Sequence, residues 1–159
     1  MDEKIITEYL RRSYSAVDGL WFMMVEKEFS FDDALKIDES VWSVLPKIQS
    51  RKAKELLRLE GKGLADFLKA IEVKLESEGY GYELQLNEDS HIQIALRSCP
   101  WYDLLKKSNR QHLGPLLADR ICALEFRIWL KEFGDDLRFS TGPRCCDGDP
   151  TCLLDFAKL

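Results

Sequence analysis

The sequence has no long apolar run, little histidine and no excess of positive charge. None of its hydrophobic stretches approaches the roughly 20 residues that span a bilayer, and the start, Met1-Asp2-Glu3-Lys4, does not follow the basic-then-apolar pattern of a secretory signal. The net charge of −5 argues against a protein that binds a phosphate backbone. We therefore predict a cytoplasmic protein with no membrane segment and no nucleic-acid partner.

The five cysteines form no Cys-x-x-Cys pair, so the usual signature of a zinc ribbon or zinc finger is missing. Because five is an odd number, at least one cysteine must be unpaired within the chain. In a reducing cytosol each of the five is expected to be a free thiol. A chain of 159 residues can bury enough apolar surface to fold without disulfides or a metal. A bound metal would therefore be optional for folding.

The first half of the chain, residues 1–79, has the periodicity of amphipathic helices. Apolar residues at three- and four-residue steps predict a long helix over residues 5–25, with one stripe facing a core. Ser30 is a good N-cap for a second helix that starts near Phe31, and Pro46 predicts a kink or a break in it. Further helices of this half are expected over residues 47–59 and 64–78.

The second half, residues 80–159, changes to a period of two after Gly81. Alternating apolar and polar residues on both sides of Glu88-Asp89-Ser90 predict a β-hairpin with one buried face. The other elements expected are a helix over 101–108, a helix over 114–133, and strands over 137–140 and 152–156. The prediction is one domain, residues 1–159, of the α+β class, in which a helical N-terminal half packs with an antiparallel sheet of about four strands.

The turn between the last two strands holds Cys145, Cys146 and Cys152, while Cys99 ends a strand and Cys122 lies in the last helix. If that helix packs on the sheet, all five can meet at one end of it. A tetrahedral zinc site would then use Cys99, Cys122, Cys152 and one of the adjacent pair, for which we take Cys145. The alternative for Cys122 is a small buried apolar residue.

Two residues are candidates for catalysis. Cys99 directly precedes a helix start, where a cysteine pKa can be lowered enough to make the thiolate a nucleophile. Glu125 lies three residues after Cys122 on one helix face, and burial would raise its pKa toward that of a general base. The simpler interpretation of Glu125 is a structural ion pair. Five aromatic residues could line a pocket, although at helical spacing they are more often plain core: Tyr14, Trp21, Phe22, Trp42 and Trp101.

Several short motifs resemble those of a known family. Asp18-Gly19-Leu20-Trp21-Phe22, the stretch from Phe31 to Asp38, and Val41-Trp42 resemble a family of small prokaryotic cytosolic proteins related to the L-2-amino-thiazoline-4-carboxylate hydrolases. The second half resembles the same family at three places, and the last of them is also similar to the end of 4-vinyl reductase domains. These places are Cys99-Pro100-Trp101, Ile121 to Glu125, and Gly148 to Cys152.

The resemblance implies either opening of a thiazoline ring by water or binding of a small molecule. It marks Cys99, Cys122, Glu125, Cys145 and Cys152 as the positions to compare. A zinc ion closed by four thiolates would leave no open position for water, which argues against hydrolysis at such a site.

The prediction is therefore a small-molecule-binding domain whose cysteine cluster holds zinc. The first alternative is a hydrolase of a small cyclic compound, with Cys99 or a metal-activated water as nucleophile and Glu125 as base. The second is a structural dimerisation domain. A homodimer is compatible with the sequence, which carries no signal for the oligomeric state.

Overall fold

The computed structural model of the protein describes residues 2–86 and 90–159. In the first half the helices are α1 (Glu3–Glu28), α2 (Phe31–Trp42), α3 (Leu45–Leu57) and α4 (Gly63–Glu78). The predicted helix boundaries follow from local chemistry. Ser30 Oγ accepts a hydrogen bond from the Asp33 N–H at 3.1 Å and caps α2, and Pro46 lies in the first turn of α3, after the break from α2.

In the second half, β1 (Gly81–Leu86) and β2 (His91–Ser98) form the predicted hairpin. The predicted turn between them falls on Glu88 and Asp89, outside the described residues, and on Ser90. Strands β3 (Leu137–Thr141) and β4 (Cys152–Lys158) complete an antiparallel sheet in the order β1-β2-β4-β3. The protein thus has the α+β fold, with the sheet in the C-terminal half.

The chain between β2 and β3 is mostly helical. It contains α5 (Pro100–Lys107), the 3₁₀ turn η1 (Gln111–Leu113), α6 (Gly114–Leu117), the π-helical turn η2 (Ala118–Cys122) and α7 (Ala123–Lys131). The helix expected over 114–133 is therefore interrupted by a wider turn, a feature often found at functional sites. The cysteine turn before β4 contains the 3₁₀ turn η3 (Cys145–Asp147).

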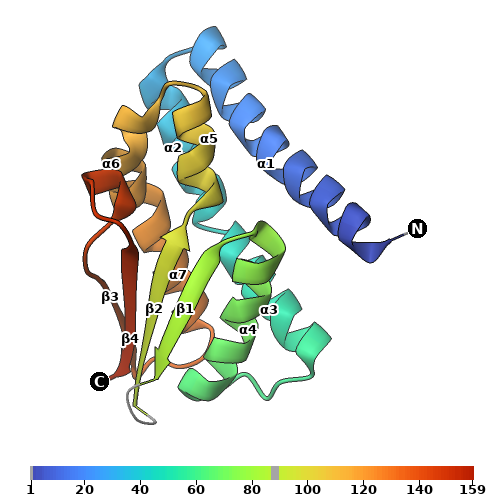
Figure 1. The fold of residues 1–159 in the computed structure, drawn as a ribbon, viewed down its shortest axis with the longest axis vertical. Helices are drawn as coiled ribbons and strands as arrows, with labels where there is room; N and C mark the ends of the chain where they lie inside the picture. Colours follow the sequence, from blue (N-terminus) through green and yellow to red (C-terminus); the bar gives the residue numbers. More distant parts are fainter. Residues whose placement is uncertain (1, 87–89) are drawn as a thin grey trace.

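The core lies where α4 and α7 cover one face of the sheet (Figure 1). Phe67 on α4 and Phe156 on β4 are fully buried, with ring centroids 4.6 Å apart. Trp129 of α7 and Ile94 of β2 complete the same cluster. Alternation along β2 and β4 places apolar side chains toward these helices, as a half-buried sheet requires.

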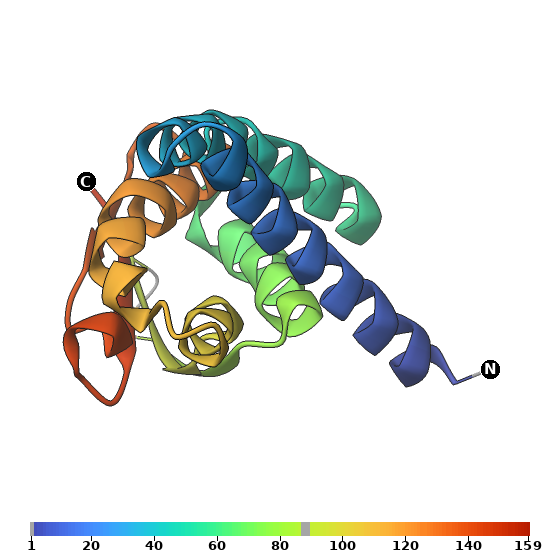
Figure 2. The ribbon, with the colours of Figure 1, turned by 90° about the horizontal axis from the view of Figure 1, so that it is seen from above.

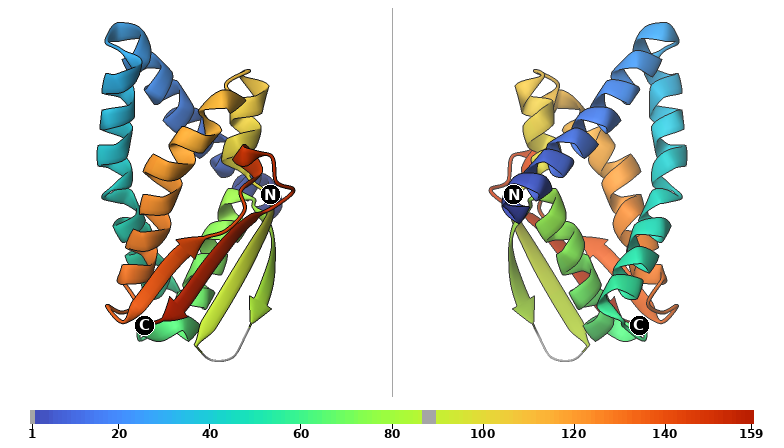
Figure 3. Two further views of the ribbon diagram at one scale, coloured as in Figure 1. Left: turned by 90° about the vertical axis from the view of Figure 1, so that its left-hand side faces the viewer. Right: turned by 90° about the vertical axis from the view of Figure 1, so that its right-hand side faces the viewer.

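The other helices extend beyond this core (Figure 3). From above, α1, α2, the α6–α7 rod and α5 are arranged as a ring (Figure 2). Polar contacts at both ends of α1 help to hold it in place, and Gln49 Nε2 also donates to Tyr14 Oη at 3.3 Å. Arg11 donates to the backbone carbonyls of Glu76 and Ser77 at the end of α4, both at 2.8 Å, and Arg110 forms a two-pronged ion pair with Glu26 at 2.7 and 2.8 Å.

The prediction that the apolar stripe of the first helix faces a core is wrong. None of the residues of α1 is buried, and Val17, Leu20 and Trp21 are 68%, 55% and 64% exposed. The periodicity correctly predicted an amphipathic helix, but no other part of the described chain covers its apolar side. Among the described residues, no helix is both long and apolar enough to cross a membrane.

Candidate functional site

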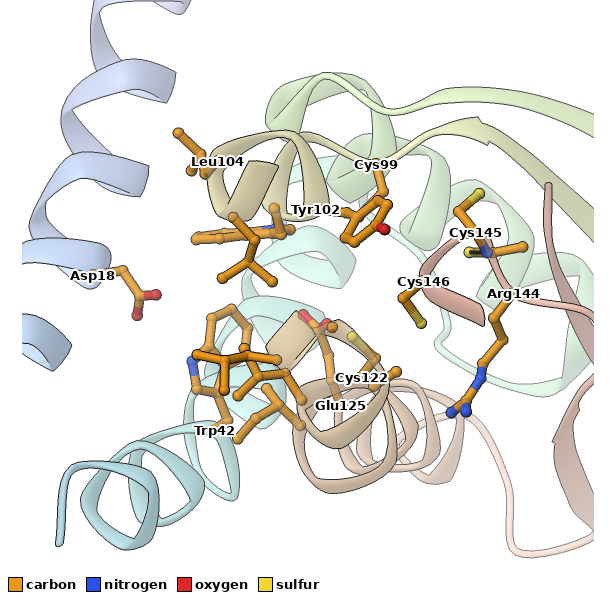
Figure 4. A pocket seen from close by; sticks show the side chains of 18 of the residues that line it. Asp18, Trp42, Cys99, Tyr102, Leu104, Cys122, Glu125, Arg144, Cys145 and Cys146 are labelled. Atoms are coloured by element: carbon orange, nitrogen blue, oxygen red, sulfur yellow. Dashed lines mark hydrogen bonds between the residues drawn. The ribbon is translucent and has the colours of Figure 1, made fainter. Parts of the chain in front are cut away.

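A cavity of about 350 Å³ lies inside the ring of helices, between α1, α2, α5, the α6–α7 rod and the C-terminal cysteine turn (Figure 4). Its volume is in the range of small-molecule sites, roughly 300–1,000 Å³. The wall is mainly aromatic and aliphatic, with Asp18 on one side, Arg144 on the other and Glu125 between them. The apolar lining includes Phe22, Met23, Trp42, Leu96, Trp101, Leu105, Leu113, Leu117, Ile121, Phe126, Leu153 and Leu154.

Asp18 of α1 and Asp38 of α2 form the acidic end of the cavity. Both are half-buried, and neither has a cationic partner within the described part of the chain. Burial and the nearby charge of Asp18 raise the pKa of Asp38 to about 7. Burial likewise raises the pKa of Asp18, and the indole N–H of Trp42 opposes the rise at both carboxyls. In Figure 4 the nitrogen edge of Trp42 turns toward Asp18.

Lys74, Glu78 and Glu125 form a buried charged cluster, and Glu125 also lines the cavity. The Lys74 ammonium is 2.7 Å from Glu78 Oε1 and 2.6 Å from Glu125 Oε1, and Trp101 Nε1 donates to Glu78 Oε2 at 3.1 Å. Burial alone would lower the pKa of Lys74, but the charges of Glu125 and Glu78 raise it above its ordinary value. Burial raises the pKa of Glu125, and the Lys74 ammonium only partly opposes this rise.

The thiols occupy the opposite end of the cavity, and all five cysteines line it. Cys122, at the end of the π-helical turn, is accessible from the cavity although protein surrounds it. Cys145 and Cys152 lie side by side, with the Cys145 N–H 3.0 Å from Cys152 Sγ. Arg144 is at the same end, where it pairs with Asp119 and Asp147.

The structure brings the predicted zinc ligands Cys99, Cys122, Cys145 and Cys152 to one cavity but does not draw them into a tight group. Nowhere in the described parts of the chain do three or more His, Cys, Asp or Glu side chains come close enough to hold a metal ion. The zinc site stays a prediction. Elemental analysis of protein purified without chelator tests it, and a zinc-free protein with five freely titrating thiols would contradict it.

The predicted catalytic residues lie on the same cavity, in different environments. Burial raises the pKa of Cys99 to about 11, so this thiol is almost entirely protonated at neutral pH. Its position before α5 does not produce the activated thiolate that the sequence suggested. Glu125, only 3% exposed, lines the cavity and also forms the ion pair with Lys74 that the simpler interpretation expected, while its role as a base stays a prediction.

No role was predicted from the sequence for Asp18, Asp38 or Lys74. A signal for the aspartates was available, since each occupies the inner side of its helix, Asp18 four residues before Phe22 and Asp38 four residues before Trp42. A carboxylate on that side is unusual enough to mark a site. Of the five aromatic residues considered, Phe22, Trp42 and Trp101 line the cavity, Tyr14 packs edge-on against Trp101, and Trp21 is exposed.

Comparisons with known proteins identify a family and a related fold. Residues 3–150 match a family described as "Family of unknown function (DUF6125)", and no curated protein matches the chain. Among solved structures, the chain is similar to a trafficking protein particle complex subunit 3 from Naegleria fowleri covalently bound to palmitic acid, with a TM-score of 0.57 and 13% identity over 98% of this chain and 96% of that chain. At that identity the likeness concerns the fold alone. The predicted relation to thiazoline hydrolases and 4-vinyl reductase domains stays a prediction.

Proposed function

Because the chain belongs to DUF6125, a family of unknown function, we propose its function from the site itself: the protein binds an apolar small molecule in the cavity and recognises a hydrogen-bond donor or amine on that molecule. The observation that carries this proposal is a cavity of about 350 Å³ with a mainly apolar wall and carboxyl groups at one end. Such a combination of apolar walls and a few placed polar groups is typical of ligand sites.

The volume and the mainly apolar wall of the cavity favour a ligand with an apolar part. Each methylene group removed from water contributes about 0.8 kcal/mol, so a chain of about ten carbons would supply most of the affinity. The trafficking subunit with the similar fold is covalently bound to palmitic acid, which supports a chain-like ligand here. Burial raises the pKa values of four thiols, which argues against their spontaneous acylation at neutral pH: Cys99, Cys122, Cys146 and Cys152.

The acidic end determines the proposed selectivity. Asp18 and Asp38 have no cationic partner among the described residues, so a protonated amine between them would replace a missing counter-ion. A ligand carboxylate at the same place would be repelled.

The experiment compares decylamine, 1-decanol and decanoic acid as competitors of the fluorescent apolar probe N-phenyl-1-naphthylamine. We expect decylamine to displace the probe at a concentration at least tenfold below that of decanoic acid. Asp38→Asn should remove most of this preference, while Asp32→Asn, an exposed carboxylate on the same helix, should preserve it. A protein that takes up no probe, or that shows the same order of competitors in Asp38→Asn, contradicts the proposal.

A second candidate function is hydrolysis of a small cyclic compound, and Glu125 is the observation that favours it. Its buried carboxyl lines the cavity with a raised pKa, as a general base at neutral pH requires. Ionised Glu125 would take a proton from water as the water oxygen attacks the ring carbon. The acid so formed would return the proton to the leaving nitrogen. Turnover of L-2-amino-thiazoline-4-carboxylate that is unchanged in Glu125→Gln would contradict this candidate.

A further inference from the structure

The outer side of the α1–α2 pair carries an unusually large exposed apolar surface. The exposed apolar residues of α1 include five that lie on one side of the helix: Leu10 (59%), Val17 (68%), Leu20 (55%), Trp21 (64%) and Met24 (49%). We call this set the α1 row. Singly exposed apolar residues are ordinary on a protein surface, but a contiguous set of this kind usually marks an interaction site.

A second row continues the surface on α2 and the start of α3. It consists of Ile37 (41%), Val41 (43%), Val44 (55%) and Ile48 (58%). We call this set the α2–α3 row. Helices α1 and α2 meet at Phe29 and Ser30 and diverge from there as the two arms of a V (Figure 3).

The ion pairs of the two helices show which way the rows turn. On α2, Glu39 pairs with Arg120 of the π-helical turn, so this side of α2 faces the α6–α7 rod. Ile37 and Val41 each lie two residues away, about 200° around the helix, and so turn away from the rod. On α1, Glu26 faces Arg110 near α5. Met24 is two residues from Glu26 and therefore turns away from α5.

Both rows have the spacing of helices that pack against other helices. The α1 row has steps of seven, three and four residues through Leu10, Val17, Leu20 and Met24, and the α2–α3 row has steps of four, three and four. Side chains repeated in this way interlock with a second helix. Because one chain carries two such rows, α1 of each protomer can pack against the α2–α3 row of the other, as in an isologous dimer.

The exposed area is sufficient for a stable interface. If each partly exposed side chain contributes about 100 Å², the nine residues of the two rows present roughly 900 Å² of accessible surface. A standard interface buries about 800 Å² on each partner. A membrane surface is a poorer occupant for this face, because the chain has a net charge of −5 and anionic lipids attract basic helices.

We propose that the protein forms a twofold-symmetric homodimer in which the α1 row of each protomer packs against the α2–α3 row of its partner. This contact would cover the α1 row, which the described part of the chain leaves exposed. It also supports the cavity, because α1 contributes Asp18 and Phe22 to the cavity wall from its opposite side.

Light scattering coupled to gel filtration of the full chain tests the proposal. We expect a species of about twice the 18.5 kDa chain mass. Leu20→Lys and Val41→Glu should each weaken self-association at least 30-fold, which is the effect expected from losing one central hot-spot residue. Leu159→Glu changes a leucine that is 81% exposed at the C-terminus and should leave the dimer intact. Because the substituted side chains are exposed, each variant should fold. Circular dichroism and thermal unfolding check this.

Mixing the two variants tests the reciprocal arrangement. A mixed dimer of Leu20→Lys and Val41→Glu chains has one unchanged α1–α2 contact and one that joins lysine to glutamate, so the equimolar mixture should regain the dimer mass. A mixture that stays monomeric overturns the arrangement. A wild-type chain that is monomeric at 100 µM, or that remains dimeric with either substitution, overturns the proposed interface, as does binding to phosphatidylserine vesicles that depends on Leu20.

Discussion

The half of the molecule built on the sheet and the half built around the cavity use their apolar residues in opposite ways. On the sheet, Phe67, Ile71 and Phe156 are completely buried and interlock across α4, α7 and the strands. Around the cavity, Phe22 and Trp101 line the wall, and no residue of α1 is buried. Dense packing stabilises a fold, whereas a binding site needs apolar surface that stays uncovered.

The largest effect should come from truncating the sheet core. Phe67→Ala removes a ring with no exposed surface, and we expect it to lower the free energy of unfolding by about 4 kcal/mol through lost burial and the void left behind. Phe22→Ala, at the cavity wall, should cost about 1 kcal/mol because its ring already lacks neighbours on one side. Urea unfolding measures both, and equal losses would contradict the division into two halves.

The buried charge at the border between the halves should come next. Lys74→Met leaves the carboxylates of Glu78 and Glu125 together without their cation, and we expect a loss of about 3 kcal/mol at pH 8. Adding Glu125→Gln should recover part of this loss, and acid should reduce it, because protonation removes the uncompensated charge. Lys69→Met changes an exposed lysine of the same helix and should change stability by less than about 0.5 kcal/mol.

The acidic end of the cavity predicts a stability that falls as pH rises. The pKa of Asp38 is about 7 in the folded chain and 3.8 ordinarily, so between these values the folded state holds a proton that the unfolded state has released. Its contribution is greatest below pH 4 and declines up to pH 7. For a half-buried group we expect a decline of about 1 to 2 kcal/mol.

Comparison of wild type with Asp38→Asn isolates this contribution from those of the other carboxyls. The difference between the two free energies of unfolding should change across pH 4 to 7, and Asp32→Asn should show no such trend. A difference that is independent of pH would contradict a raised pKa of Asp38 in the folded protein.

The smallest effect should come from filling the cavity. Ala123→Leu adds apolar volume at the cavity wall, and we expect stability to change by less than about 1 kcal/mol because the space is already there. Uptake of N-phenyl-1-naphthylamine should fall at least tenfold. Full uptake by a folded Ala123→Leu chain would place the probe elsewhere, and circular dichroism checks the fold.

Much of the fold could be read from the sequence because its signals are local. Ser30 caps α2, Pro46 marks the start of α3, and Gly79 ends α4 in the left-handed conformation at a φ of 83°. The change of period after Gly81 placed the hairpin. The π-helical turn at Ala118–Cys122 was missed, because widening one turn leaves the apolar pattern nearly unchanged. The short 3₁₀ turns at Gln111–Leu113 and Cys145–Asp147 were not predicted either.

The candidate site was predicted only in part. The five cysteines do reach one cavity, but reaching a common wall differs from converging within bonding distance of a metal, and residue spacing cannot distinguish the two. Glu125 was recognised from its position beside Cys122. Its partner Lys74 was not, because the two lie on helices that are distant in the chain and meet only in the folded protein.

The sequence by itself determined the helices, the strands and the α+β class, since hydrogen bonding, capping and side-chain periodicity act over a few residues. The tertiary structure alone decided that Asp18 and Asp38 share one end of a cavity, that the thiols spread over the other end, and that the apolar side of α1 remains uncovered. Each of these depends on which surfaces meet. A hydrophobic pattern shows that a helix has an apolar side, but only the arrangement of the whole chain shows whether anything packs against it.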